Sequence, residues 1–180
     1  MSFLSNLRLL SQYNQVMNQK VYQVALELGD QETMKDQGAF FDSIFGTLNH
    51  IYVADIIWLK RFAQHPQQYS SLNNLPELDN YRVLNQRVAN DLGTLNKLRE
   101  KLDLIIADWC QEITPQNLDH NLRYFDTKGN LYCKNFGQLL QHFFNHQTHH
   151  RGQVSTLFSQ QGLDLGVTDL LMLIPEQDDS

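Results

Sequence analysis

Cysteine is scarce in this sequence, and long apolar runs are absent from it. The 180 residues include two cysteines, Cys110 and Cys133, which do not form a CxxC pair. Two cysteines are too few for a disulfide framework, and they are compatible with a reducing cytoplasm as well as with one disulfide bond. No stretch approaches the roughly 18 consecutive apolar residues of a transmembrane helix. The sequence therefore predicts neither a disulfide-stabilised secreted domain nor a membrane-spanning protein.

Positive charge is also limited. The chain has 14 lysines and arginines against 20 aspartates and glutamates, which gives a net charge of −6 at pH 7. No basic run could neutralise several phosphates, so neither a nucleic acid nor a membrane is expected as a partner. The N-terminal stretch MSFLSNLRLL lacks the basic segment and the uninterrupted apolar run of a signal peptide. We therefore expect a cytoplasmic protein.

What the sequence does contain is helical periodicity. Its length and its hydrophobic fraction of 42% are those of one domain over residues 1–180 with a sizeable core. Apolar residues recur at spacings of three and four in four long segments: from about Phe3 to Leu28, from about Gly38 to Ala63, from a cap at Asp79 or Asn80 to the stop at Pro115, and from Asn135 to about Gln161. The third segment places Tyr81, Leu84 and Val88 on its apolar stripe.

Two shorter features complete the predicted fold. The stretch LRYFDTKGNLYCK alternates aromatic and polar residues around a Lys128-Gly129-Asn130 turn, which predicts a β-hairpin before the last helix. The tail, GLDLGVTDLLMLIPEQDDS, has an apolar patch that we expect to dock on the helices. Four amphipathic helices with mostly short connections predict an all-α fold, a four-helix bundle whose cofactor sites lie between facing helices.

Histidines cluster on the last predicted helix. Four of them, His142, His146, His149 and His150, fall within nine residues. On a helical wheel His150 lies about 40° and His146 about 80° from the apolar direction, and the other two lie beyond about 100°. His146 and His150 are therefore the inward pair, and two imidazoles one turn apart can bind one ion. The alternative is a polar helix face that happens to be rich in imidazole.

A third ligand is expected from the second helix, where His50 stands in TLNHIYVADIIW. Gly46 and Ala54, one turn away on either side, are small and leave room beside the imidazole. A lone histidine there is more often a hydrogen-bonded core residue, but together with the HxxxH pair it completes a three-ligand site. We expect His65 and His120 at the surface.

Three neutral histidines suit zinc, nickel, iron or copper, and a three-ligand site keeps positions open for water or substrate. A ferritin-like di-iron site is excluded because the chain has no E-x-x-H motif. Gln147 follows His146, so the glutamate that serves as general base in an HExxH enzyme is missing. Asp55 is a candidate proton acceptor, with a hydrogen bond to a neighbouring helix as the alternative.

The segments LNHIYVADIIWLKRF and HFFNHQTHHRGQV resemble the two signature segments of the DinB family, the DinB/YfiT-like four-helix-bundle metalloproteins. The resemblance extends over nearly the whole chain. In that family one histidine of the second helix and two of an HxxxH motif on the last helix bind a divalent metal. The resemblance thus implies His50, His146 and His150 as metal ligands, and it implies a bundle of unusual connectivity that is often a homodimer. It assigns no catalytic residue.

Five further residues match the family pattern: Asn49, Trp58, Arg151, Gly152 and Gln153. We expect Gly152 to permit close helix packing, and Arg151 and Gln153 to be polar supports near the site, with a purely structural role as the alternative for each of these two side chains.

The family includes thiol-dependent S-transferases and a mycothiol-dependent isomerase. The resemblance therefore implies a metalloenzyme that uses zinc, nickel or iron to activate a low-molecular-weight thiol towards a small-molecule substrate. One alternative is a metal-dependent hydrolase with the same three ligands. Another is a non-catalytic bundle in which the site stabilises a dimer or senses metal or stress. The family name refers to induction by DNA damage and gives no reason to expect DNA binding.

Overall fold

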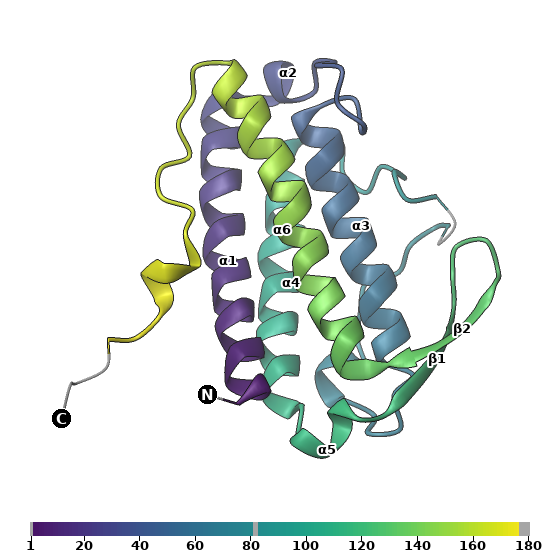
Figure 1. Ribbon diagram of the computed structural model, residues 1–180. Coiled ribbons are helices and arrows are strands. Elements are labelled where there is room, and N and C mark those ends of the chain that lie inside the picture. Colours follow the sequence, from purple (N-terminus) through teal and green to yellow (C-terminus); the bar gives the residue numbers. More distant parts are fainter. Residues whose placement is uncertain (1, 81–82, 177–180) are drawn as a thin grey trace.

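The computed structural model describes residues 2–80 and 83–176. Four long helices lie side by side (Figure 1): α1 (Phe3–Leu28), α3 (Ile44–Phe62), α4 (Leu92–Glu112) and α6 (Phe136–Gln160). Short elements connect or follow them: α2 (Asp30–Thr33), the 3-10 turn η1 (Ser70–Leu72), α5 (Pro115–Leu118), the strands β1 (Asn121–Phe125) and β2 (Leu131–Asn135), and the 3-10 turn η2 (Leu170–Leu173). The protein is thus mostly helical with one hairpin. No helix within the described ranges is long and apolar enough to cross a membrane.

The first and last long helices confirm the predicted bounds, and their ends have clear causes. The Ser2 side chain caps α1 by accepting a hydrogen bond from the Ser5 amide, and Gly29, with φ 86°, ends the helix. Asn135 caps α6 by accepting from the Gln138 amide at 3.0 Å. Short polar side chains at these positions satisfy amides that the helix itself leaves without partners.

Helix α3 begins six residues later than the predicted start at Gly38. The cause is Ser43, whose side chain accepts from the Gly46 amide at 3.0 Å and caps the helix there. The loop before it turns through Asp42, which has φ 64°, and folds back over the first turn of α3. A Cβ on Gly46 would overlap the Phe41 carbonyl oxygen. Gly46 therefore makes room for this loop, and it does so at a position where we expected room for the His50 imidazole.

The predicted start of the third long helix at Asp79 or Asn80 is wrong. Helix α4 begins at Leu92, because the Asp91 carboxylate caps it by accepting from the Thr94 amide at 2.7 Å. The described residues between η1 and Asp91 form no helix or strand. Leu84 is exposed and Val88 half-buried in this loop, and Tyr81 lies outside the described residues. The three-and-four spacing of the apolar residues in this segment therefore does not reflect a helix. The segment is a loop that passes beside α3.

The predicted hairpin is confirmed. β1 and β2 pair antiparallel, with Asn121 opposite Asn135 and Phe125 opposite Leu131. In the turn, the Asp126 carboxylate accepts from the amides of Lys128 and Asn130, both at 2.8 Å. The hairpin projects from the lower end of the helices beside α3 (Figure 1).

The two cysteines are free thiols. Cys110 is buried in α4, and Cys133 is exposed on β2. A disulfide between them, which the sequence left open, is not formed.

The C-terminal segment docks on α1 differently from the prediction. The Tyr13 hydroxyl donates to the Thr168 carbonyl and the Lys20 ammonium to the Val167 carbonyl, both at 2.7 Å. The apolar patch that follows stays outside, because Leu171 and Met172 are about 70% exposed (71% and 70%). Hydrogen bonds from α1 side chains to main-chain carbonyls, together with the partly buried Leu163 and Leu165, therefore hold this segment.

Candidate metal centre

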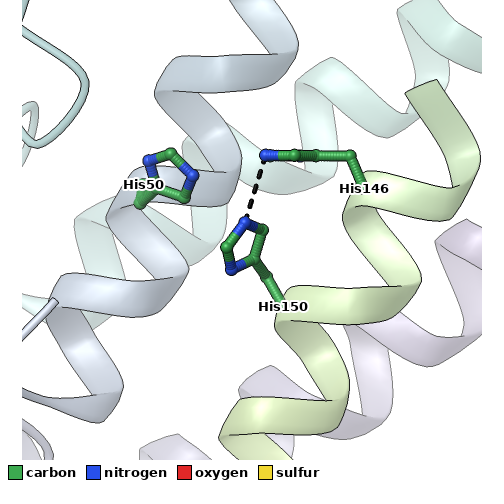
Figure 2. Close-up of side chains that lie close together, drawn as sticks. All are labelled: His50, His146 and His150. Carbon is green, nitrogen blue, oxygen red and sulfur yellow. Dashed lines mark hydrogen bonds between the residues drawn. The ribbon is translucent and has the colours of Figure 1, made fainter. Parts of the chain in front are cut away.

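Three histidines converge between α3 and α6 (Figure 2). His50 lies in the second turn of α3, and His146 and His150 lie on consecutive turns of α6. Their ligand nitrogen atoms all lie within 4.8 Å of one another. The Nε2 atoms of His146 and His150 are 3.1 Å apart. In the described part of the chain, no other group of three or more histidine, cysteine or acidic side chains is as close. We call this group the histidine triad.

The orientation of His50 is fixed from two sides. Its Nδ1 lies 3.0 Å from the Leu84 carbonyl oxygen, which can only accept, so Nδ1 carries the proton and Nε2 keeps its lone pair. The Phe41 ring stacks on the imidazole with 3.8 Å between ring centroids and 16° between ring planes. Both partners come from loops whose place the sequence did not predict. A backbone carbonyl such as that of Leu84 leaves no signal in a sequence.

His150 is held in the same way. Its Nδ1 lies 2.7 Å from the Gln153 side-chain oxygen, so the proton is again on Nδ1 and Nε2 faces the centre. The expectation that Gln153 is a polar support near the site is confirmed. Partners of this kind orient a metal-binding imidazole and raise its basicity.

The triad is neutral at physiological pH. Burial, together with the nearby His150, lowers the pKa of His50 to about 4, although the bond to Leu84 acts in the other direction. Burial lowers the pKa of His146 to about 3, with further lowering from His150 and His50. The pKa of His150 is lowered by the same main cause. Neutral imidazole is the form that binds a metal ion.

The other two histidines of the cluster lie at its edge, as the helical wheel predicts. His149 and His142 are both exposed. The His142 ring lies 5.0 Å from the Trp58 ring and 6.0 Å from the His146 ring, centroid to centroid. His142 therefore extends the row of histidines along α6 towards Trp58.

The prediction that His65 lies at the surface is wrong, and His120, predicted at the surface as well, is half-buried. His65 is 4% exposed and lies against the rings of Tyr69 and Phe136. Its Nδ1 accepts from the Gln67 amide at 3.1 Å. His120 is half-buried, with its ring 4.6 Å from that of His65. The loop after α3 folds under the start of α6 and takes His65 into the core.

Asp55 does not serve as a proton acceptor at the triad. It is fully buried and its carboxylate pairs with Arg99 of α4, with 2.5 Å between Nη1 and Oδ2. Burial raises the pKa of Asp55 to about 6, while Arg99 acts to lower it. The alternative role, a contact to a neighbouring helix, is the one that the structure has. Among the described residues no aspartate, glutamate or cysteine joins the three histidines at ligand distance.

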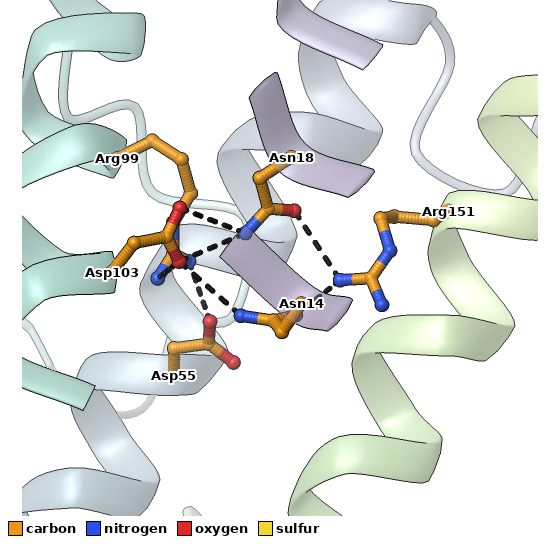
Figure 3. A network of polar contacts seen from close by, with 6 residues as sticks. All are labelled: Asn14, Asn18, Asp55, Arg99, Asp103 and Arg151. Atoms are coloured by element: carbon orange, nitrogen blue, oxygen red, sulfur yellow. Dashed lines mark hydrogen bonds and ion pairs between the residues drawn. The ribbon is translucent and has the colours of Figure 1, made fainter. Parts of the chain in front are cut away.

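Asp55 belongs to a buried network that connects all four long helices (Figure 3). Arg99 also pairs with Asp103 at 2.8 Å. Asp103 in turn accepts from the side-chain amides of Asn14 and Asn18 at 3.2 and 3.0 Å. We call this set the charged network: Asn14, Asn18, Asp55, Arg99, Asp103 and Arg151.

Arg151 connects α6 to the network. Its guanidinium donates to the side-chain oxygens of Asn14 and Asn18. Arg151 is therefore a support of the helix packing, and no bond joins it to a triad imidazole within the described residues. Gly152 does not permit close packing as expected, because a Cβ there would meet nothing within 4 Å.

The charged network is not among the sequence predictions, although the sequence carries a signal for it. Asn14 and Asn18 are four residues apart on the buried side of α1, and Arg99 and Asp103 are four apart on the buried side of α4. Polar residues at core spacing indicate a buried polar cluster.

Comparison with known proteins gives the family of the chain. The profile of the DinB family matches residues 1–179. Protein DinB of Bacillus subtilis (strain 168) is 24% identical over 160 residues, which cover 89% of this chain and 88% of that relative. No solved structure matches the chain. Because the family profile covers nearly the whole sequence, the chain belongs to the DinB family.

Proposed function

We propose that the protein binds a divalent metal ion through His50, His146 and His150. One observation carries the proposal: three neutral imidazoles from two helices direct their nitrogens at a common point, within 4.8 Å of one another. Two of them have their Nδ1 protons held by oxygen acceptors, which leaves Nε2 as the ligand atom.

The distances fit a metal. Two nitrogens bound to one tetrahedral ion at about 2.1 Å are about 3.4 Å apart. The 3.1 Å between the Nε2 atoms of His146 and His150 is close to that separation. The donor set suits zinc, nickel or iron, and supply decides among them. Three protein ligands leave room for an exogenous ligand, which is typical of a reactive site and unlike a closed structural zinc site.

We propose further that the exogenous ligand is a low-molecular-weight thiol that is transferred to a small-molecule electrophile. A bound divalent ion would supply Lewis acidity that lowers the pKa of the thiol and gives a thiolate at neutral pH. Hydrolysis would need a proton acceptor for water, and Asp55 is engaged with Arg99. A thiol has a pKa of about 8.5 and needs less help to lose its proton. No observation favours the hydrolase alternative.

Metal analysis by mass spectrometry of the untagged protein tests the proposal. We expect about one ion per chain in the wild type, and none in His146→Ala because a ligand is lost. His142→Ala removes an exposed histidine from the same helix and should keep the ion. A wild type that takes up no zinc, nickel or iron after reconstitution would reduce the triad to a polar helix face and leave the non-catalytic alternative.

The thiol is tested on protein reconstituted with cobalt. Adding a thiol should produce a sulfur-to-metal charge-transfer band in the wild type and none in His146→Ala. A cobalt spectrum that does not respond to thiols would contradict the thiol-transfer proposal while leaving the metal site in place.

We propose that residues 1–180 are one metal-binding domain with a four-helix bundle of the DinB/YfiT-like type. The extent of the family match and the mutual contacts of the four long helices support this. Homodimer formation and a cytoplasmic location stay predictions.

A further inference from the structure

A groove opens between α3, α6 and the hairpin, next to the histidine triad. Its volume is about 360 Å³, which suits part of a small organic ligand. Six residues line it: Trp58, Tyr124, Lys134, Gln138, Leu139 and His142. We call it the hairpin groove.

Two rows of side chains lead from the triad to this groove. On α3 the row runs through His50, Ala54 and Trp58 at intervals of four residues, which places them on one helix face. Ala54 is the small residue between the metal ligand and the groove wall. The row on α6 runs the same way, from His146 to His142 at the groove edge, with 6.0 Å between ring centroids.

On the side away from the hairpin groove, an aromatic ring covers the triad. Phe41 stacks on His50 and lies 5.6 Å from the His150 ring, centroid to centroid. The two rows end on the opposite side, at Trp58 and His142, whose ring centroids are 5.0 Å apart and which both line the groove.

Aromatic side chains form one wall of the groove. The Trp58 and Tyr124 ring centroids are 5.4 Å apart, and Tyr132 stacks on Tyr124 at 5.7 Å with 25° between the planes. Such a wall favours a planar or apolar ligand frame.

Two positive charges border this wall. The Arg61 guanidinium lies 4.5 Å from the Trp58 ring centroid and 5.1 Å from that of Tyr124. The Lys134 ammonium lies 5.1 Å from the Tyr132 ring centroid. Within residues 2–80 and 83–176 neither forms an ion pair.

Burial lowers the pKa of Arg61 while the negative charge of Asp126 acts to raise it, but within the described residues the two form no ion pair. The Asp126 carboxylate instead accepts hydrogen bonds from the amides of Lys128 and Asn130 in the hairpin turn. Lys134 lines the groove, and Arg61 lies against the Trp58 and Tyr124 rings of its wall, so two cations without ion pairs among the described residues adjoin it in a chain of net charge −6. They create a site that attracts an anion.

We propose that the hairpin groove binds the anionic end of the substrate, a carboxylate on a planar or apolar frame, while the reacting end lies at the triad. This inference deepens the proposed function, on which it rests. Arg61 and Lys134 bind the carboxylate, and Trp58 and Tyr124 bind the frame. Small organic acids with an aromatic or similarly flat body are thus the substrate class.

Calorimetric titration of the zinc-loaded full chain tests this, with phenylacetate as the probe and phenylacetamide as its uncharged counterpart. We expect phenylacetate to bind about tenfold more tightly, about 1.4 kcal/mol. Lys134→Gln should weaken phenylacetate binding about two- to fivefold, as for an exposed ion pair, and leave phenylacetamide unchanged. The double variant with Arg61→Gln should abolish the preference.

Lys128→Gln is the matched control, because it removes the same charge from the exposed tip of the same hairpin. Equal affinities for the two probes, or equal losses in Lys128→Gln and Lys134→Gln, would overturn the inference.

His146→Ala separates this inference from the proposed function. Phenylacetate binding that survives in His146→Ala supports the groove, since the carboxylate then does not depend on the ion. Binding lost in His146→Ala but kept in Lys134→Gln would place the carboxylate on the metal and refute the groove. If the wild type holds no metal yet prefers phenylacetate through Lys134, the metal proposal fails and the anion site stands.

Discussion

The histidine triad and the charged network lie on adjacent faces of α6, and they differ in how their polar groups are satisfied. In the network, Arg99 lies between the carboxylates of Asp55 and Asp103, so charges of opposite sign compensate one another. In the triad, neutral imidazoles turn their nitrogens towards one another. The network pairs its opposite charges within the protein, whereas the triad has one hydrogen bond among its own rings, between the Nε2 atoms of His146 and His150, and carries no charge that would oppose a bound cation.

The two clusters use neighbouring positions of α6 for different purposes. Gln147 and Arg151 follow His146 and His150 directly in the sequence, so one helix presents ligands on one face and core contacts on the next. We infer that the charged network fixes how the helices pack and that the triad is free to serve binding. Substitutions should therefore separate stability from metal affinity.

The largest effect is expected for Arg99→Met. Its side chain is 1% exposed, and its loss would leave Asp55 and Asp103 as buried carboxylates without their cation. We expect a loss of about 3–5 kcal/mol in the free energy of unfolding, measured by urea denaturation of the metal-free protein. Lys97→Met, an exposed change on the same helix, should cost little. A loss below about 1 kcal/mol in Arg99→Met would show that the network does not hold the helices together.

The reverse behaviour is expected for His150→Ala. Metal-free wild type and variant should unfold at similar urea concentrations, because the half-buried imidazole belongs to no ion pair among the described residues. Zinc at about one hundred times its dissociation constant should then stabilise the wild type by about 2.7 kcal/mol and the variant hardly at all. His149→Ala, one residue away and exposed, should respond to zinc as the wild type does. A variant that zinc still stabilises fully would remove His150 from the ligand set.

The two clusters also differ in how far the sequence predicts them. The convergence of His146 and His150 follows from helical periodicity alone, and His50 follows from its place on the facing helix. The cap at Asn135 likewise predicts a helix start, because its capping bond depends on a residue three positions away, Gln138.

What the sequence could not predict depends on contacts between distant segments. Asn49 accepts from the Val88 amide at 3.0 Å and donates to the Gln86 carbonyl at 2.8 Å, which holds the loop before α4 against α3. This loop carries the Leu84 carbonyl to His50. The apolar residues of this loop have the spacing of a helix. Only its contact with α3 decides between a helix and an irregular loop. The charged network likewise depends on which polar residues of different helices meet, which spacing within one helix does not give.

Asn49→Ala tests whether a residue outside the triad acts on it. Both bonds to the loop are lost, so the Leu84 carbonyl is held less firmly against His50. We expect zinc affinity, measured by competition with a chelator, to fall about tenfold. The free energy of unfolding should fall by about 1–2 kcal/mol. In the control Gln86→Ala the affinity should stay, because Asn49 binds the main chain of residue 86. Unchanged affinity in Asn49→Ala would mean that His50 needs no support from the loop.

The smallest effect on zinc affinity is expected at Gln153, where two substitutions separate the hydrogen bond from the charge. Gln153→Ala removes the acceptor of the His150 Nδ1 proton, and zinc affinity should fall by a few-fold to about tenfold. Gln153→Glu keeps the acceptor and adds a negative charge, so the imidazole becomes a more basic ligand and affinity should equal or exceed that of the wild type. Gln160→Ala, exposed on the same helix, should change neither affinity nor stability.

A carboxylate at residue 153 gives the triad the kind of partner that the charged network already uses. If zinc affinity falls as much in Gln153→Glu as in Gln153→Ala, the neutral amide matters for its shape, and orientation by hydrogen bonding is not what prepares His150 for a metal.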